Sequence, residues 1–166
     1  MDLNWIVLLL SALLPLVVGF IWYSPMLFAK AWMKASGLDE EKLKGANLVK
    51  IFGLTYLLSI FIAISINFIV IHQWHIYSIL AEEAGIADPN SEIGQYLKNF
   101  LEKYGHNFRT FKHGAFHGAL SGILLAWPMI AVNALFERRG TKYVAINAGF
   151  WILSFMLMGG VICAFN

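Results

Sequence analysis

The sequence has little charge, and the two signs nearly cancel. Only 13% of its 166 residues are Asp, Glu, Lys or Arg, against roughly a quarter in an ordinary soluble domain. The net charge of +2 lacks the clustered positive charge that nucleic-acid binding requires, so we expect no nucleic-acid partner. The hydrophobic content of 59% excludes a disordered chain, because such chains have too little apolar surface to bury.

Cysteine is also nearly missing. The single Cys163 excludes an internal disulfide, a CxxC redox pair and a CxxCH haem attachment. The sequence also lacks a glycine-rich phosphate loop, a serine-nucleophile motif and the HExxH zinc-hydrolase motif. These absences give no support to an enzymatic function, and the sequence identifies no catalytic residue.

Four stretches of 21 to 23 residues carry no charge at all: 3–23, 51–71, 114–136 and 143–165. About 20 such residues in a helix cross a hydrocarbon core of about 30 Å, and in lipid only a helix or a closed barrel satisfies its own backbone. The stretches lack the polar and apolar alternation of barrel strands. The sequence therefore predicts an all-α fold, with residues 1–166 forming a single integral membrane four-helix bundle.

The basic residues are divided unequally between the two sides of this predicted bundle. Eight belong to the two short connecting segments, and four belong to the long central segment. Because cytoplasmic loops are enriched in Lys and Arg, we expect the short loops to be cytoplasmic. Both termini and the central segment should then lie outside the cell membrane.

The first connecting segment is expected to contain a short interfacial helix. Ser24 is suited to cap its start and Pro25 to occupy its first turn. Aromatic and apolar side chains with two lysines then indicate a helix that lies in the membrane interface. Gly37 should end it.

The central segment, about 76–112, is too long for a simple connection. We expect the second span to continue as a helix towards Gly85. An amphipathic helix should follow, capped by Ser91 and closed by Gly105. We expect this helix to pack over the outer end of the bundle or on the lipid surface.

Small residues form a stripe on two of the predicted spans. They recur every four residues as Gly114, Gly118, Gly122 and Ala126 in the third span and as Thr55, Ser59, Ala63 and Asn67 in the second. Such stripes let membrane helices approach closely. We expect the two stripes to face each other, or to face copies of themselves in a homo-oligomer. Pro128 should bend the third span below this contact.

A rival interpretation of the spans is a passive pore or small-solute carrier. It rests on polar residues within them, which are Thr55, Ser59, Ser65, Asn67, Ser121, Asn133, Asn147 and Ser154. No acid or base accompanies these residues, which disfavours coupled ion transport.

Four of the five histidines lie where the second span leaves the membrane and the third enters it. His72 and His75 are three residues apart, and His113 and His117 are four apart, so each pair shares a helix face. Because the two spans run antiparallel, His72 should reach the depth of His117 and His75 that of His113. Four converging imidazoles suit Zn or Cu, and the deeper pair could instead ligate haem iron. The simpler interpretation is that all four histidines are surface groups at the boundary between the membrane and water.

Two further patterns resemble a known family. The stretch 19–33, with Trp22, Tyr23, Ser24 and Pro25, looks like the opening signature of a family of small bacterial membrane proteins known as domain of unknown function seventeen-sixty-one. The closing pattern of that family is similar to the stretches 133–139, 147–151 and 158–160, which include Asn133, Glu137, Arg138 and Asn147. The resemblance implies a four-helix protein of the bacterial inner membrane and supplies no established activity.

The basic residues of the last loop have two interpretations. Glu137 paired with a lysine or arginine would clamp the two short loops together. Alternatively, Arg138, Arg139 and Lys142 would contact an anionic lipid head.

Taken together, the sequence predicts a non-enzymatic membrane component that acts by contact in the lipid bilayer, with itself or with other membrane proteins. The alternatives are a metal-binding or haem-binding protein and a passive pore or small-solute carrier.

Overall fold

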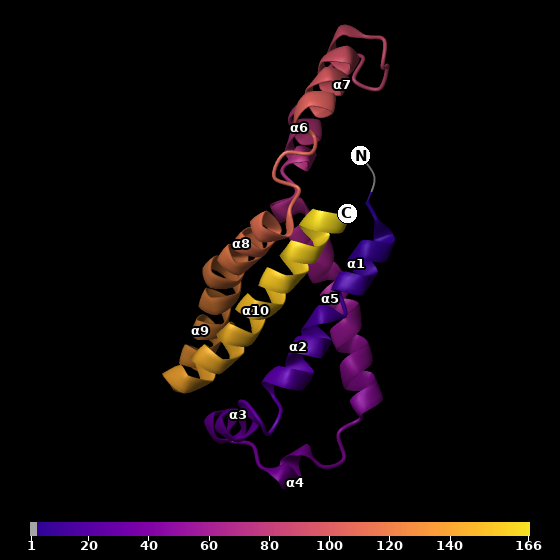
Figure 1. Cartoon of the computed structure of the whole chain (residues 1–166). Helices are drawn as coiled ribbons and strands as arrows, with labels where there is room; N and C mark the ends of the chain where they lie inside the picture. The colour runs from indigo at the N-terminus through magenta and orange to yellow at the C-terminus, as the bar shows by residue number, and fades with distance from the viewer. Residues whose placement is uncertain (1–2) are drawn as a thin grey trace.

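The computed structural model describes residues 3–166, and these residues form helices, turns and loops without a β-strand (Figure 1). Four helical segments are long and apolar enough to cross a membrane: Trp5–Trp22, Leu48–Val70, Phe111–Phe136 and Thr141–Phe165. The predicted all-α fold with four spans is confirmed. Three of the spans begin two or three residues before the charge-free stretches, because the helices include Lys50, Lys112 and Lys142. Long lysine side chains can extend from a helix end to the membrane surface.

The first span is interrupted near its middle. α1 (Trp5–Ser11) stops at a turn, and α2 (Leu14–Trp22) begins with Pro15 in its first turn. Proline has no amide hydrogen and cannot continue the hydrogen-bond ladder of α1, but its fixed φ suits the start of a new helix. This break was not predicted from the sequence.

The third span changes its winding before Pro128. α8 (Phe111–Ser121) is followed by a π-helical turn, η1 (Gly122–Ala126), and then by α9 (Trp127–Phe136). The Trp127 amide bonds to the carbonyl of Gly122, five residues back. This wider turn accommodates a proline that can neither donate a hydrogen bond nor tolerate a close carbonyl. The distortion expected at Pro128 therefore lies in the turn that precedes it.

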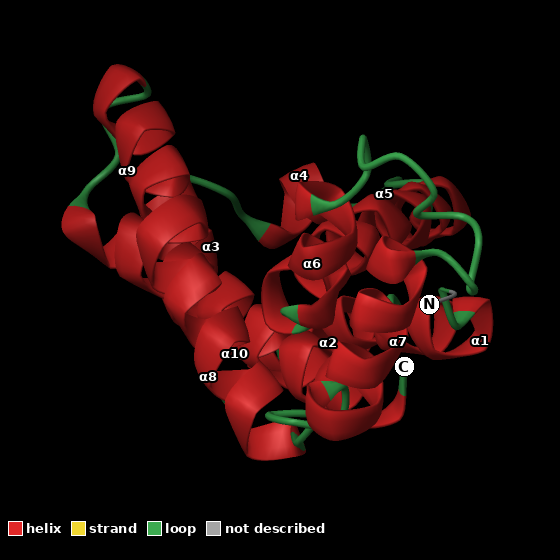
Figure 2. Ribbon diagram, turned by 90° about the horizontal axis from the view of Figure 1, so that it is seen from above, coloured by secondary structure: helices red, strands yellow, loops and turns green. Residues whose placement is uncertain are grey.

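The last helix, α10 (Thr141–Phe165), is the centre of the bundle. It packs against α1, α2, α8 and α9, and also against α5 (Leu48–Val70). Viewed along the bundle, α8, α9 and α10 lie together on one side, and α1 and α2 lie on the other (Figure 2). Because α10 contacts every other span, it fixes where the ends of α5 and α8 lie.

The glycine stripe of the third span packs against α10 and not against the stripe of α5. A Cβ on Gly114 would collide with the Gly159 carbonyl, and one on Gly118 would collide with the Phe155 carbonyl. A Cβ on Gly122 would lie 2.6 Å from the Ile152 Cα. The expectation that the two stripes face each other is therefore wrong.

The remaining stripe residues lie elsewhere in the bundle. Ala126 lines a cavity on the membrane-spanning surface. Ser59, Ala63 and Asn67 are buried and Thr55 is half-buried on α5, which packs against α1 and α10. The α5 stripe is defined by residue size alone, and size does not specify which neighbouring helix a stripe meets.

The bundle has two chemically different ends. The basic end carries the short segments 23–47 and 137–140, and the histidine end carries Asn4, Asn166 and the segment 71–113. Both described ends of the chain lie at the histidine end (Figure 1). There the Asn166 side chain donates to Asn67 Oδ1 and accepts from the Asn4 amide at 2.6 Å. These bonds tie α1, α5 and α10 together.

At the basic end, the chain turns through residues 24–28 before α3 (Ala29–Ser36) begins. The predicted cap at Ser24 is wrong, because Phe28 stands at the N-cap position. Gly37 ends the helix as predicted, with a left-handed φ of 66°. A further short helix, α4 (Glu40–Leu43), follows.

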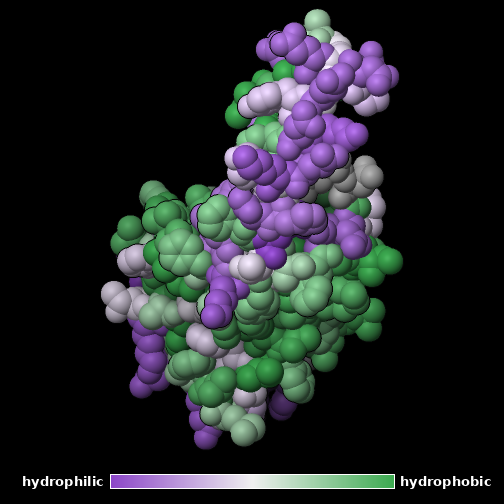
Figure 3. Space-filling view, turned by 45° about the horizontal axis from the view of Figure 1, so that its top comes forward, coloured by the Kyte–Doolittle hydropathy of each residue, from purple (hydrophilic) through white to green (hydrophobic). Residues whose placement is uncertain are grey.

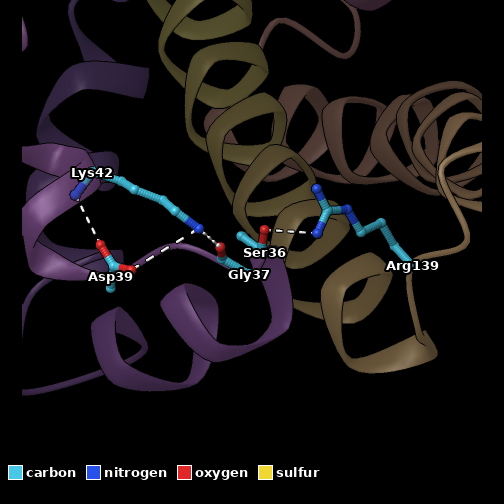
Figure 4. Close-up of polar contacts among 5 residues, drawn as sticks. All are labelled: Ser36, Gly37, Asp39, Lys42 and Arg139. Carbon is cyan, nitrogen blue, oxygen red and sulfur yellow. Dashed lines mark hydrogen bonds and ion pairs between the residues drawn. The ribbon is translucent and has the colours of Figure 1, made fainter.

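The two short loops are joined at the basic end by an arginine. Arg139 Nη1 donates to the Ser36 carbonyl at 2.6 Å, as Figure 4 shows beside the contacts of Lys42 with Asp39 and Gly37. Glu137 instead pairs with Arg139 of its own loop, at 3.6 Å. The expected Glu137 clamp is therefore wrong, and the contact that crosses between the two loops comes from Arg139.

Two helices project from the histidine end. α6 (Gln73–Ile79) and α7 (Glu92–Tyr104) stand above the bundle (Figure 1), as a hydrophilic projection on an apolar body (Figure 3). Ser91 caps α7 by accepting from the Gly94 amide at 3.0 Å, and Gly105 follows its last residue, both as predicted. The expectation that this helix lies across the bundle end or on the lipid surface is wrong.

Candidate metal centre

Three histidines converge at the histidine end. His72 Nε2 lies 2.9 Å from His113 Nε2. The His117 ring centroid lies 4.8 Å from that of His72 and 4.4 Å from that of His113. One ring nitrogen from each residue lies within 4.8 Å of the other two. We call His72, His113 and His117 the histidine triad.

These separations are close to those of a metal site. With Zn–N distances of about 2.0–2.1 Å, tetrahedral ligand nitrogens lie about 3.3 Å apart. The triad nitrogens therefore need only small side-chain movements to share an ion. Three imidazoles leave the fourth tetrahedral position open, as in zinc sites that bind water or substrate.

The triad forms because α5 and α8 both pack on α10. Val70 and Ile71, which immediately precede His72, are buried in one cluster with Ile162 and Cys163 of α10. On the other side, Gly114 and Gly118 seat α8 against the backbone of α10. His113 and His117 flank these glycines and are half-buried. Close packing of small residues thus places the ends of α5 and α8 side by side.

His75 lies outside the triad. Its ring centroid is 6.3 Å from that of His72, and His72, not His75, contacts His113. The reason is a break in the second span, since α5 ends at Val70 and Ile71 has an extended ψ of 92°. α6 then starts on a new axis, so the depth expected for His75 does not apply, whereas His72 does meet His117 as predicted. The expected continuation towards Gly85 also fails, because α6 ends at Ile79.

The electrostatics of the triad favour a neutral imidazole at His72. Burial lowers the pKa of His72 below its ordinary value, and the neighbouring His117, His113 and His75 lower it further. A histidine must be neutral to ligate a metal. Within the described chain, the convergent group contains no carboxylate or thiolate. A divalent ion held by the triad would therefore keep its full charge.

Haem does not fit this arrangement. Axial ligation by His72 and His117 requires a planar macrocycle between the two rings. His113 touches both of these rings, with centroids 5.0 and 4.4 Å away. The third imidazole occupies the space that a porphyrin would need.

Phe108 borders the triad and was missed by the sequence analysis. Its ring centroid lies 5.1 Å from that of His113, and its carbonyl accepts from the buried Cys163 thiol at 3.3 Å. Its φ of 62° is unusual for a bulky residue. Such strain gathers at ligand sites. No sequence signal marks this position, because no glycine or asparagine stands there.

A cavity of about 360 Å3 opens beside the triad. His72 forms part of its wall, together with Ile76 of α6, Phe100 and Tyr104 of α7, and Phe108. The cavity thus connects the triad to the projecting helices.

Several of the other predicted site residues make local contacts. Among the polar residues of the spans, four bond to backbone carbonyls of their own helix: Thr55, Ser65, Ser121 and Asn147. Asn67 is bonded to Asn166, and Asn133 is exposed. These bonds give no support to a polar path through the bundle. Of the basic residues assigned to lipid, Arg139 is bonded to Ser36, whereas Arg138 and Lys142 are exposed.

The two signature stretches meet in space at the basic end. Trp22 Nε1 donates to the Ile146 carbonyl at 3.1 Å, and Tyr23 Oη donates to Asn147 Oδ1 at 3.0 Å. Ser24 and Pro25 form the turn that follows. The opening signature therefore docks on the last helix.

Comparison with known proteins identifies the family. No curated protein and no solved structure gives a significant match. The family model described as protein of unknown function (DUF1761) matches residues 6–163, which is nearly the whole chain. This is the family that both signature stretches resemble. The protein therefore belongs to the DUF1761 family, as a small multi-pass membrane protein.

Proposed function

We propose that this protein binds a divalent transition-metal ion, Zn2+ or Cu2+, through His72, His113 and His117. The observation that carries the proposal is the convergence of three imidazole nitrogens within 4.8 Å. Imidazole is a favourable ligand for both ions. The lowered pKa of His72 supports the same conclusion, because it keeps that ligand neutral.

The distribution of charge supports an orientation for this site. Eight of the 12 basic residues belong to the basic end, and basic loops are retained in the cytoplasm. The triad then lies at the outer face of a bacterial inner membrane. It would take its ion from outside the cytoplasm.

Metal binding takes precedence over self-association as the proposed function. Self-association was expected to use the glycine stripe of the third span, but Gly114, Gly118 and Gly122 are covered by α10. A second copy or another membrane protein would have to bind a different surface.

The test is metal analysis of the full chain, purified in mild detergent without a histidine tag. After removal of metal and titration with Zn2+, we expect about one ion per chain. Replacing any triad histidine with alanine should weaken binding by about tenfold or more, because loss of supporting groups alone costs 10- to 100-fold in metal sites.

His75→Ala is the matched control. His75 is exposed on the same segment as His72 but lies outside the triad, so this variant should bind Zn2+ as the wild type does. Equal binding by wild type and the His113→Ala and His117→Ala variants would overturn the proposal. A loss confined to His75→Ala would also contradict it.

A further inference from the structure

The triad would hold its ion with an unbalanced charge. Three neutral imidazoles leave a divalent ion at +2, and within residues 3–166 the convergent group includes no Asp, Glu or Cys. Sites with three protein ligands keep a position for a water or an external ligand. Because none of the protein ligands is negative, the ion attracts an anion to that position more strongly than a neutral ligand.

The cavity beside the triad gives this external ligand a place for an apolar body. Its volume of about 360 Å3 lies at the small end of the range for small-molecule sites. Phe100 and Tyr104 contribute two rings in contact, with centroids 5.1 Å apart and planes tilted by 53°, and Ile76 lines the same cavity. His72 belongs both to this wall and to the triad.

The cavity lies in the projecting part of the molecule. Its walls come from α6, α7 and the loop that leads to α8, which stand outside the membrane-spanning segments. A ligand therefore reaches it from the aqueous side. This location favours a water-soluble molecule over a lipid chain.

We infer that the metal site takes a small organic carboxylate as a further ligand, with the carboxylate on the ion and an aromatic or other compact apolar body in the cavity. This inference rests on the proposed metal site. The carboxylate supplies the negative charge that the triad lacks, and burial of the apolar body supplies selectivity over simple anions.

The experiment uses the Co2+-loaded protein in mild detergent, because tetrahedral Co2+ has visible absorption bands that respond to a change of ligand. The probes are benzoate, acetate and benzyl alcohol. We expect benzoate to shift the bands and to bind at least about tenfold more tightly than acetate, which lacks the apolar body. Benzyl alcohol, which lacks the charge, should leave the bands unchanged.

Variants of the cavity wall distinguish the contribution of the cavity to benzoate binding from that of the ion. Phe100→Ala should reduce benzoate binding to the level of acetate, while Co2+ and acetate bind as before. Ile76→Ala, which changes the part of the wall that α6 contributes, should act in the same direction. Tyr96→Ala is the control, because Tyr96 lies one turn earlier on α7, is 56% exposed and is outside the cavity wall.

The outcomes also distinguish failure of this inference from failure of the proposed metal site. Failure of the protein to bind Co2+ overturns the metal site, and the inference with it. Normal Co2+ binding with equal affinity for benzoate and acetate overturns the inference alone. So does a benzoate preference that survives both cavity variants.

Discussion

His72 occupies the joint between a helix that crosses the membrane and one that leaves it. It follows the C-cap of α5 and stands at the N-cap of α6, so its imidazole is not confined to the face of either helix. That freedom lets it approach both His113 and His117 from α8. The position of His72 between two helices therefore explains its place in the triad better than its three-residue spacing from His75 does.

The lowered pKa of His72 predicts how the stability of the metal-free protein depends on pH. A histidine with a lower pKa in the folded state takes up more protons when the chain unfolds. The free energy of unfolding should therefore be highest above the ordinary pKa of 6.5 and should fall as the pH drops below it. Thermal unfolding in detergent from about pH 7.5 to about pH 5 measures this effect.

The His72→Ala variant should show a shallower decline over the same range. His106→Ala, which removes an exposed histidine outside the triad, should keep the wild-type decline. A midpoint temperature of unfolding that rises as the pH falls would contradict the lowered pKa of His72.

At the scale of helices, the contact between α8 and α10 aligns the site. Glycines meet across it, since a Cβ on Gly159 would collide with the Gly114 carbonyl and would lie 3.2 Å from the Gly118 Cα. The two backbones are thus as close as helices without side chains between them allow. Any side chain inserted here must move α8, and with it two of the three triad residues.

Gly118→Val should therefore abolish metal binding while leaving every triad histidine in place. We expect the free energy of unfolding to fall by about 1–3 kcal/mol, as for other overpacked interiors. Zn2+ titration and thermal unfolding measure the two effects. Gly53→Val is the control, because a Cβ on Gly53 meets no atom within 4 Å. Normal Zn2+ affinity in Gly118→Val would show that the contact does not position the site.

The four spans and the cap of α7 were predictable from the sequence because their causes are local. Absence of charge over about 20 residues indicates a span. Ser91 caps α7 by accepting from the nearby amide of Gly94. The partner of the glycine stripe was not predictable, because Gly114 and Gly118 fit any close helix equally well. His113 meets His72 and not His75 because the chain bends at Ile71. The sequence has no glycine or proline there that would predict the bend.

At the scale of the molecule, the two ends carry different kinds of contact. The basic end is fastened by Arg139 on Ser36 and by Tyr23 on Asn147. Burial raises the pKa of Tyr23 well above its ordinary value, with a smaller contribution from Tyr143, so its hydroxyl remains a hydrogen-bond donor. The histidine end holds the triad, the cavity and the projecting helices. The end that these contacts fasten and the end that carries the triad are thus separated by the full length of the bundle.

The proposed orientation predicts which end is accessible from outside the cell. A cysteine introduced by Glu92→Cys, exposed at the start of α7, should react with a membrane-impermeant maleimide on intact cells. A cysteine introduced by Glu41→Cys, exposed in α4, should react only after the membrane is opened. The native Cys163 is buried and should give little background. The reverse labelling pattern would invert the orientation and place the triad in the cytoplasm.

The contact between His72 and His113 joins residues 41 positions apart in the chain. A metal ion shared by these residues would act as a reversible cross-link that closes the intervening loop. Closing a loop removes chain entropy in proportion to the logarithm of its length, as a disulfide does, but here the link dissociates when metal is scarce. Bound metal would then add to the packing on α10 that holds the two ends of this loop together, and its removal would make the loop easier for a protease to cut.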